Sequence, residues 1–406
     1  MADPQTPVLI RHQDAELFTT TLLLAAGVPR PAAAITASAL VEADLRGVES
    51  HGINRLPSYL ARIRAGVLDP AAEPTLTQIT PAVAQIDAHN TLAFPPCALA
   101  IDTAVALAST SGIALVSVKN SNHFGMAAWL VRRALSSGPY LVQIFTNASP
   151  ALAPWGGRAP LLGVNPIAVG APGRPRPFIL DMAPSVAARG WIHRALRRGE
   201  GIPGGWALDE RGGGTEDPAE ALRGGATMVP IGGPKGVGLA VVGEVMGGVM
   251  SGTGGFAGGV RGPGDLRGEA GVGRMYCRIS CCPGPEALGG RWTAVSVPWC
   301  FPELVPMLTW AFFADLVVVM RADLFVSAEE FRERMGVLWE RVVGAERREG
   351  VDRIWFPGEK EQVCEDERRE KGIPYVRGEV DTLNAEADRL SVERLREMDE
   401  QVVTEE

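Results

Sequence analysis

The sequence predicts an α/β protein, and three observations lead to this class. Apolar strand-like segments alternate with helical periods between residues 98 and 182, as in a sheet covered by helices. Helical periods occur over residues 14–26, 31–46 and from Leu56 to Gly66. Hydrophobic residues make up 46% and charged residues 21% of the 406 residues, an ordinary globular composition with enough length for a sizeable core in two lobes or one capped domain.

Three helices are predicted at the start of the chain. The first covers residues 14–26 and ends at a glycine, and the second runs from Pro31 to Arg46 and ends at Gly47. The third carries apolar residues at helical spacing from Leu56 onward, again up to a glycine. A short polar connection, Ser50-His51-Gly52, joins the second helix to the third and therefore places a histidine between two helix ends.

Strands and helices alternate in the middle of the chain, and the late part is irregular. The patterns predict helices over 98–110, 124–136 and 234–250, and strands over 113–118, 140–145, 166–171 and 178–182. More than half of the 48 glycines lie between residues 199 and 290. From Ala328 onward the sequence is charge-dense and amphipathic, which is typical of a helix with one apolar face.

Charge and composition exclude several classes of function. The net charge of −8 offers no broad basic surface for nucleic acid, although a single arginine suffices for a small anionic metabolite. No secretory signal and no apolar stretch long enough to cross a membrane are present, so we expect a cytoplasmic protein. The six cysteines are scattered, and the cluster Cys277, Cys281 and Cys282 has no histidine nearby; we therefore predict reduced thiols and no metal site.

Two histidine segments are the strongest candidates for a site. Ser50 to Arg55 and Asn120 to Gly125 each place a histidine in a polar loop flanked by glycine, where a proton donor for a substrate oxygen would lie. Arg55 follows His51 by four residues and can bind a carboxylate with its planar fork. The alternative for either histidine is a loop side chain satisfied by the backbone.

Three further polar residues accompany these histidines. Thr146 and Asn147 follow a predicted strand, and Asp181 ends another. A carboxylate at the end of a buried strand requires a partner, and a histidine N–H is a common one.

Two glycine-rich segments resemble nucleotide-binding motifs without matching them. Residues 252–257 fit the GxGxxG/A pattern, but a helix precedes them and an irregular stretch follows, which is the wrong context for a Rossmann fingerprint. Gly232 to Gly236 lacks the spacing and the Ser or Thr of a Walker A motif. Lys235 in this loop either contacts a phosphate or is a solvated turn residue.

Several ordered motifs resemble the type 2 malate/L-lactate dehydrogenase family. They occur over about residues 10–252 and resume weakly over 311–390, and they comprise Leu45 to Arg55, Asn120 to Gly125, Thr146-Asn147 with Ala153 to Gly157, Leu162 to Pro166, Leu180 to Ala183 with Ala188 to Gly190, Ile202 to Asp209, Pro230 to Gly238, and Phe356 to Glu359. The family includes ureidoglycolate, sulfolactate and diketogulonate oxidoreductases and cyclic-imine reductases. Two departures are Val164, where members often have threonine, and Trp310 to Phe313, which lacks an expected histidine.

The resemblance implies a fold and a set of site residues. It implies a non-Rossmann domain with a mixed sheet that binds NAD or NADP, a helical lobe built from both termini, and a homodimer. His51 resembles an acid/base oriented by Ser50 and kept cationic by Asp181, and His123 resembles the alternative acid/base. Arg55 resembles a carboxylate clamp, with Thr146 and Asn147 near the substrate. Positions that resemble cofactor contacts are Phe124, Gly125, Met126, Ala127, Ala171, Pro172, Gly173, Lys235, Pro357, Gly358 and Glu359.

We therefore expect an oxidoreductase that moves hydride between NAD(P) and a small 2-hydroxy or 2-oxo acid such as malate or lactate. A cyclic 2-imino acid reductase is one alternative. A catalytically silent member, remodelled by a late insertion, is another.

Four parts of the chain are expected. They are a helical lobe over 1–75, the cofactor-binding domain over 76–252, an irregular insertion over 253–310, and a segment over 311–406 that returns to the helical lobe. The insertion is expected to be poorly ordered, because its composition buries too little apolar area to offset the entropy of ordering it. A read-through intron or shifted frame would produce it, and a genuine lineage-specific loop is the alternative.

Overall fold

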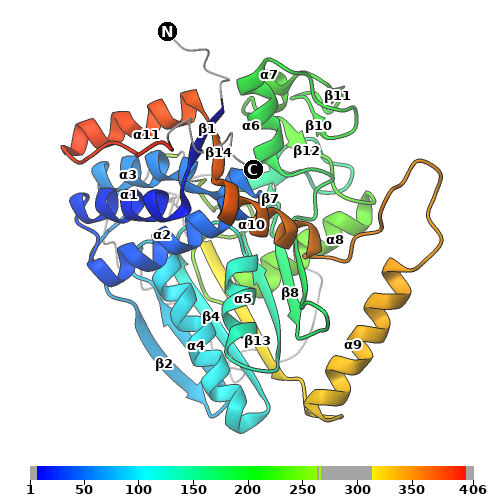
Figure 1. Cartoon of the computed structure of the whole chain (residues 1–406). Coiled ribbons are helices and arrows are strands. Elements are labelled where there is room, and N and C mark those ends of the chain that lie inside the picture. Colours follow the sequence, from blue (N-terminus) through cyan, green and yellow to red (C-terminus); the bar gives the residue numbers. More distant parts are fainter. Residues whose placement is uncertain (1–6, 263–264, 267–312, 399–406) are drawn as a thin grey trace, which may run out of the picture.

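The computed structural model describes residues 7–262, 265–266 and 313–398 (Figure 1). Its helices are α1 (His12–Ala25), α2 (Arg30–Leu45), η1 (Glu49–His51), η2 (Ile53–Arg55), α3 (Leu56–Arg64), α4 (Phe94–Ser111), α5 (Ala128–Ser136), α6 (Arg189–Arg198), α7 (Pro218–Ala221), α8 (Pro234–Gly243), η3 (Glu244–Val249), α9 (Ala328–Val343), α10 (Glu359–Lys371) and α11 (Arg377–Leu390). The mixed α/β class predicted from the sequence is confirmed.

A seven-stranded mixed sheet forms the centre of the molecule. Its strands are β2 (Thr75–Thr80), β3 (Val83–Asp87), β4 (Ile113–Ser121), β5 (Tyr140–Thr146), β8 (Ile167–Ala171), β9 (Phe178–Met182) and β13 (Phe313–Arg321), in the order β2-β3-β4-β13-β5-β8-β9. The β3–β4 pair is parallel and the other neighbouring pairs are antiparallel. β13 thus comes from the late part of the chain and inserts between two strands from its first half.

Helices enclose this sheet. α4 packs on β4 and β13, and α5 packs on β5 and β8; both lie in front of the sheet in Figure 1. η3 contacts β13 and β5 from behind in the same view. Buried apolar side chains from α4, α5 and the strands form the larger of two cores, and this core continues into α1, α2 and α3.

The two ends of the described chain meet in the helical region. β1 (Pro7–Ile10) pairs antiparallel with β14 (Ile373–Val376), and α11 contacts α1 and α3. α10 contacts α2, the helix that leads into the His51 segment. Figure 1 shows these early and late elements, blue and red, side by side.

A smaller lobe has its own sheet and core. Its five short strands are β6 (Pro150–Leu152), β7 (Leu162–Gly163), β10 (Ala207–Leu208), β11 (Gly214–Thr215) and β12 (Thr227–Met228), in the order β11-β10-β12-β6-β7. α6 supplies Ile192 and Ala195 to its core, which is much smaller than the first. α6, α7, β10, β11 and β12 lie together at the upper right of Figure 1.

The first ten residues of the glycine-rich stretch after η3, residues 253–262, pack on the body of the protein. Residues 253–262 have no regular secondary structure, as predicted, but Thr253 and Val260 are each only 3% exposed. The backbone N–H of Ala257 donates to Glu244, and Arg62 donates to the carbonyl of Asp265. Residues 253–262 therefore pack on the body of the protein, and the expected poor order of the insertion stays a prediction. Most of the remaining stretch, 263–264 and 267–310, lies outside the described residues.

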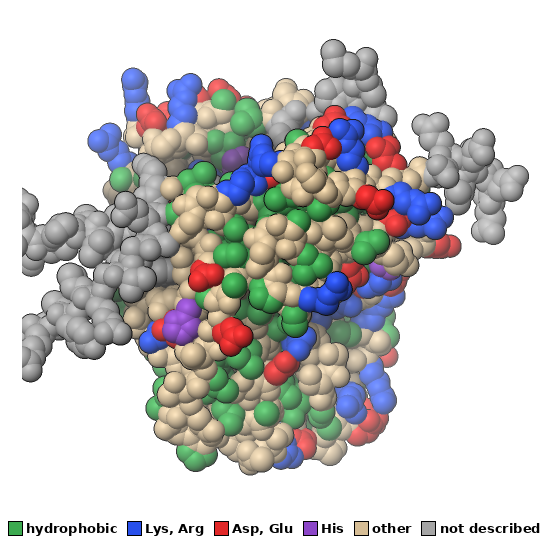
Figure 2. All heavy atoms as spheres, turned by 90° about the vertical axis from the view of Figure 1, so that its left-hand side faces the viewer, with side chains coloured by type: hydrophobic (Ala, Val, Ile, Leu, Met, Phe, Trp, Pro, Cys, Tyr) green, Lys and Arg blue, Asp and Glu red, His purple; other side chains and the backbone are tan. Residues whose placement is uncertain are grey.

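The surface opposite the small lobe is poor in charge. Figure 2 shows that charged side chains are sparse in the lower half of this face, where Figure 1 places α4 and β2. All six residues of β2 are exposed, including Leu76 and Ile79. No helix within the described residues is long and apolar enough to cross a membrane.

Candidate active site

A cleft of about 1990 Å³ lies between the large core and the small lobe, and it gathers most of the predicted site residues. Its walls include Ser50, His51, Arg55, His123, Phe124 to Ala127, Thr146, Asp181, Pro357 and Gly358. Ligand cavities typically measure about 300–1,000 Å³ for drug-sized molecules. This cleft is therefore large enough for a dinucleotide together with a small acid.

His51 stands at the end of η1, where the chain turns between α2 and α3. Its Nδ1 atom lies 2.8 Å from Oγ of Ser50. Burial in the cleft, and then the charge of Arg55, lowers the pKa of His51 to about 3. In the ligand-free protein this environment disfavours the charged imidazole, and the expected cationic state in the substrate complex stays a prediction.

Asp44, at the end of α2, fixes this turn through hydrogen bonds. Its Oδ2 atom accepts the backbone N–H of Ile53 at 2.9 Å and the hydroxyl of Tyr375 at 2.8 Å. Burial raises the pKa of the Asp44 carboxyl to about 8. A Cβ at Gly52 would lie 1.7 Å from Oδ1 of Asp44, so only glycine fits beside His51.

Charged side chains of the late helix α10 contact the same segment. Arg368 donates to Glu49 of η1 at 2.7 Å. Arg46, directly after α2, forms an ion pair of 2.9 Å with Glu365, with both side chains at most 3% exposed. Arg132 of α5 contacts Glu365 as well, at 2.9 Å. Groups from three parts of the chain thus set the position of the His51 turn.

His123 follows β4 and lies against His51. The two rings stack with centroids 5.4 Å apart and an interplanar angle of 21°. Nδ1 of His123 lies 2.6 Å from the hydroxyl of Tyr59, and the backbone N–H of Gly125 donates to the same nitrogen at 3.3 Å. Burial, then His51 and Arg55, holds the pKa of His123 well below its usual range.

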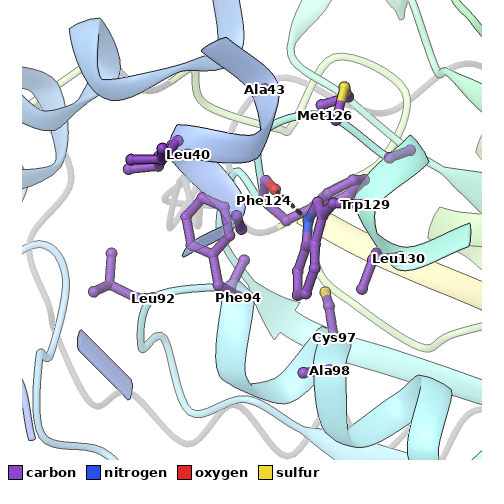
Figure 3. Close-up of a cluster of buried hydrophobic side chains, with 14 of the residues drawn as sticks. Leu40, Ala43, Leu92, Phe94, Cys97, Ala98, Phe124, Met126, Trp129 and Leu130 are labelled. Carbon is purple, nitrogen blue, oxygen red and sulfur yellow. Dashed lines mark hydrogen bonds between the residues drawn. The ribbon is translucent and has the colours of Figure 1, made fainter. Parts of the chain in front are cut away.

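The large core supports the loop after His123. Figure 3 shows Phe124 and Met126 entering a cluster with Leu40, Phe94 and Trp129, and the indole N–H of Trp129 donates to the carbonyl of Phe124 at 3.2 Å. A Cβ at Gly125 would lie 3.2 Å from the Phe94 ring. The loop is therefore attached to buried aromatic side chains, and its outer side forms the cleft wall.

Two arginines line the same cleft, one from the large core and one from the small lobe. Arg55 lies at the end of η2, and its Nε donates to the carbonyl of Ser50 at 2.5 Å. Arg189 is the first residue of α6, in the small lobe. A Cβ at Gly190 would lie 2.2 Å from Cβ of Ser50, so the start of α6 abuts the His51 turn.

Arg189 is a half-buried cation. Burial, and then the charge of Arg55, lowers the pKa of Arg189. Among the described residues, no hydrogen bond or ion pair joins its side chain to another residue. A cation in this position, close to a second one, is electrostatically suited to an anionic ligand.

Asp181 does not pair with either histidine. Its Oδ2 atom accepts the backbone N–H of Ala128 at 2.8 Å, the first residue of α5. A carboxylate is favoured there because it satisfies free N–H groups at a helix start. Loss of hydration raises the pKa of Asp181 to about 6, although the side chain faces the open cleft. The expected role in orienting His51 is thus corrected: Asp181 caps α5.

Thr146 and Asn147 are also used differently from the expectation. The hydroxyl of Thr146 donates to the buried carboxyl of Asp315 in β13, although part of the residue lines the cleft. Asn147 is fully buried, accepts the backbone N–H of Ala314 at 2.7 Å and donates to the carbonyl of Gly255. Their polar groups therefore hold β13 and residue 255 together, and their expected contact with substrate stays a prediction.

The residues expected to contact a cofactor fall into two groups. Phe124 to Ala127, Pro357 and Gly358 line the cleft, and Gly358 has φ +89° with no room for a Cβ beside Ile179. The remaining ones are absent from its walls: Ala171, Pro172, Gly173, Lys235 and Glu359. Glu359 instead accepts the backbone N–H of Phe356 at 3.2 Å and pairs with Arg353. Lys235 is exposed at the start of α8.

Two residues of the site were not predicted from the sequence. Tyr59 lies on the apolar face of α3, so its helical spacing indicated only a core residue. Arg189 stood in a stretch that carried the family resemblance but no assigned role. No signal in the sequence pairs Tyr59 with His123, which is 64 residues away.

Metal-binding groups are not gathered in the described part of the chain, where no cluster of three or more potential ligands occurs. Cys97 is buried and Cys364 is half-buried, and both are free. Cys277, Cys281 and Cys282 lie outside the described residues.

Comparison with known proteins gives matches over most of the chain. The sequence profile of the malate/L-lactate dehydrogenase family matches residues 10–293 and 287–384, so the first match continues past residue 252, where we expected the resemblance to stop. A (2R)-3-sulfolactate dehydrogenase (NADP(+)) of Chromohalobacter salexigens is 40% identical over 60% of this chain and 73% of its own. A Δ1-pyrroline-2-carboxylate reductase of Ancylobacter novellus is 38% identical over 61% and 72%. The solved structure of malate dehydrogenase from Pyrococcus horikoshii superposes with a TM-score of 0.79 at 28% identity, covering 96% of this chain and 97% of that one.

Proposed function

Because the chain belongs to the malate/L-lactate dehydrogenase family, we propose that it is an NAD(P)-dependent oxidoreductase acting on a small 2-hydroxy or 2-oxo acid. The observation that carries this proposal is the meeting of His51, His123 and Arg55 in one deep cleft. An imidazole can exchange the proton of the substrate oxygen, and a guanidinium can orient the substrate through its carboxylate.

The substrate has a second anionic group in this proposal. Arg55 binds the carboxylate next to the reacting carbon, and Arg189 lines the same cleft close enough for its charge to interact with that of Arg55. Two neighbouring cations in one cleft suit a dianion better than a monocarboxylate. The relatives named for sulfolactate and the neighbour named for malate take substrates with two such groups.

The cleft fits a nicotinamide dinucleotide beside this substrate. Its volume allows for both molecules, and Gly125 and Gly358 present backbone without a side chain at its wall. Phe124 to Ala127, with Pro357 and Gly358, are the residues that we propose hold the cofactor. When bound, the nicotinamide supplies or accepts the hydride. Val164 also lines the cleft and offers no hydrogen bond there.

Reduction of a cyclic 2-imino acid is the second candidate, and the reductase relative favours it. Such a substrate has one carboxylate, and it becomes cationic when its nitrogen is protonated. Arg189 would then repel the reacting end of the substrate rather than bind it. The position of Arg189 therefore ranks the 2-oxo acid above the imine.

The finer features of the fold belong to the same proposal. We propose that the large mixed sheet, rather than a Rossmann unit, carries the cofactor, and that β1, β14 and the flanking helices act as one lobe built from both termini. We also propose a cytoplasmic homodimer. β2 is an uncharged edge strand with exposed apolar residues, and such an edge can pair with a second copy. Light scattering coupled to gel filtration tests the dimer.

A turnover assay tests the proposed activity. The protein is mixed with NADH or NADPH and with oxaloacetate, 3-sulfopyruvate, pyruvate or Δ1-pyrroline-2-carboxylate, and loss of nicotinamide absorbance is followed. We expect turnover with a dianionic 2-oxo acid, at a kcat/KM at least about tenfold above that for pyruvate. Turnover restricted to the imine would replace the proposal with the second candidate.

A further inference from the structure

The two histidines differ in the hydrogen bonds at Nδ1, and we propose that this difference divides the chemistry between them. His51 exchanges the proton with the substrate oxygen, whereas His123 stays neutral and only donates a hydrogen bond from Nε2 to that oxygen. The inference rests on the proposed oxidoreductase function.

His123 is restricted to one tautomer by its neighbours. The backbone N–H of Gly125 donates to Nδ1 at 3.3 Å, and an amide N–H can only donate. Nδ1 must therefore present its lone pair, and the ring hydrogen lies on Nε2. The Tyr59 hydroxyl is a second donor at 2.6 Å. It retains its proton because burial raises the pKa of Tyr59.

A base must have a free nitrogen toward the substrate, and His123 has none. Its Nε2 already carries hydrogen, and a second proton on Nδ1 would point at the Gly125 N–H. His123 can still polarise a carbonyl through Nε2–H, because a neutral imidazole is a hydrogen-bond donor.

His51 meets the opposite condition. Its Nδ1 partner is a hydroxyl, Oγ of Ser50 at 2.8 Å, which can either donate or accept. Both neutral tautomers and the imidazolium are therefore satisfied at Nδ1, and Nε2 is free to lose or gain a proton. The serine adapts to each state by rotating its O–H bond.

The charges around the pair allow only one imidazolium. The rings stack at 5.4 Å, Arg55 faces both, Tyr59 approaches from α3, Phe313 from β13, and Arg189 from α6. Burial, and then the charge of Arg55, lowers the pKa of His51, and burial, then His51 and Arg55, lowers the pKa of His123. A substrate carboxylate on Arg55 compensates its charge, which raises the pKa of His51 in the complex.

The proton balance is then complete in both directions. During reduction, the N–H bond at Nε2 of His51 breaks and an O–H bond forms on the substrate as C2 receives hydride. During oxidation, the substrate O–H bond breaks and Nε2 of His51 takes the proton as hydride leaves C2. His123 keeps its own hydrogen throughout.

Four variants test this division by conservative rescue. A glutamine amide can place an N–H near the position of Nε2–H but cannot exchange a proton at neutral pH. His123→Gln should therefore recover about tenfold of the kcat that His123→Ala loses, whereas His51→Gln and His51→Ala should be equally slow, by about 10²–10⁴-fold. Equal rescue at both positions, or rescue at His51 alone, would overturn the inference. His89→Gln, outside the cleft, is the matched control and should keep wild-type kcat.

Nitrogen NMR of the cofactor-free protein gives a readout independent of turnover. We expect His123 as the neutral Nε2–H tautomer from pH 5 to about pH 9. The Tyr59→Phe variant should retain this tautomer through Gly125 N–H, with a changed Nδ1 shift. A hydrogen on Nδ1 of His123, or an imidazolium at neutral pH, contradicts the division. If the wild type turns over none of the 2-oxo acids, the proposed function fails while this measurement still decides the tautomer.

Discussion

The two walls of the cleft are built on cores of very different size. The wall with His51 and His123 rests on the large core, through Phe94, Trp129 and the buried Arg46–Glu365 ion pair. The wall with Arg189 belongs to the small lobe, where the core has about a fifth as many buried apolar residues and Trp191 and Leu196 of α6 are exposed. The proton-exchanging groups, His51 and His123, are therefore held by the large core. The anion-binding Arg189 lies on α6, a helix with fewer packing contacts.

This contrast has a physical basis. Proton transfer depends steeply on distance, so an error of about 1 Å can cost about 10²-fold in rate. A long-range attraction between Arg189 and an anion tolerates such an error.

Gly52→Ala should cause the largest loss. The new Cβ would lie 1.7 Å from Oδ1 of Asp44, so the His51 turn must move. We expect kcat to fall by about 10²-fold and the unfolding free energy by about 1–3 kcal/mol. Kinetics and urea unfolding measure both. Gly224→Ala in the small lobe, where no atom lies within 4 Å of the added Cβ, is the control and should change neither. An active, stable Gly52→Ala protein would contradict the fixed turn.

Arg55→Lys should weaken substrate binding even though the charge is kept. A guanidinium binds a carboxylate through two parallel hydrogen bonds, whereas an ammonium is a point charge. We expect KM to rise by about tenfold or more and the cofactor Kd to stay the same. Steady-state kinetics and a cofactor titration separate the two. Unchanged constants would remove Arg55 from the carboxylate site.

Arg189→Gln should discriminate between substrates. Losing a charged hydrogen bond costs about 1.5–3 kcal/mol, so KM for a dianionic 2-oxo acid should rise at least about tenfold. KM for pyruvate should hardly change, because pyruvate has no second anionic group. Parallel kinetics on both substrates test this. An equal rise for both would place Arg189 at the shared carboxylate instead.

Asp44→Asn should have the smallest effect, on the pH dependence of stability. Burial raises the pKa of Asp44 from 3.8 to about 8, so between these values the folded state binds more protons than the unfolded state. Stability therefore falls as pH rises through that window, and the amide should flatten the fall. Burial also raises the pKa of Asp315 to about 8, so part of the pH dependence of stability should remain in the Asp44→Asn variant. Urea unfolding at pH 5 and at about pH 8 tests the slope, and an unchanged slope contradicts an ionisable role.

The sequence predicted local structure better than it predicted pairing. Helical spacing located α1, α2, α3 and α9 closely. The insertion of β13 between β4 and β5, and the pairing of β1 with β14, were not foreseen, because the partners lie hundreds of residues apart. Hydrophobic periodicity predicts which face of an element is buried, but it does not predict which element packs against that face.

The site shows the same limit. Glycine-flanked loops and the family resemblance identified His51, His123 and Arg55, which the structure brings into one cleft. Asp181 was assigned to a histidine because a strand-end carboxylate requires a partner, but a helix N-terminus supplies that partner. Such a choice between two satisfactory partners depends on tertiary contacts that no local pattern contains.

Binding of the cofactor to the ligand-free protein tests the central claim most directly, because every role in the cleft depends on it. Nicotinamide fluorescence is titrated with the full-length protein, using NADH and NADPH separately. The account predicts saturable binding of at least one of them at one site per chain, and competition by the oxidised form. A linear, non-saturable response to both would contradict it, and would indicate a silent member of the family.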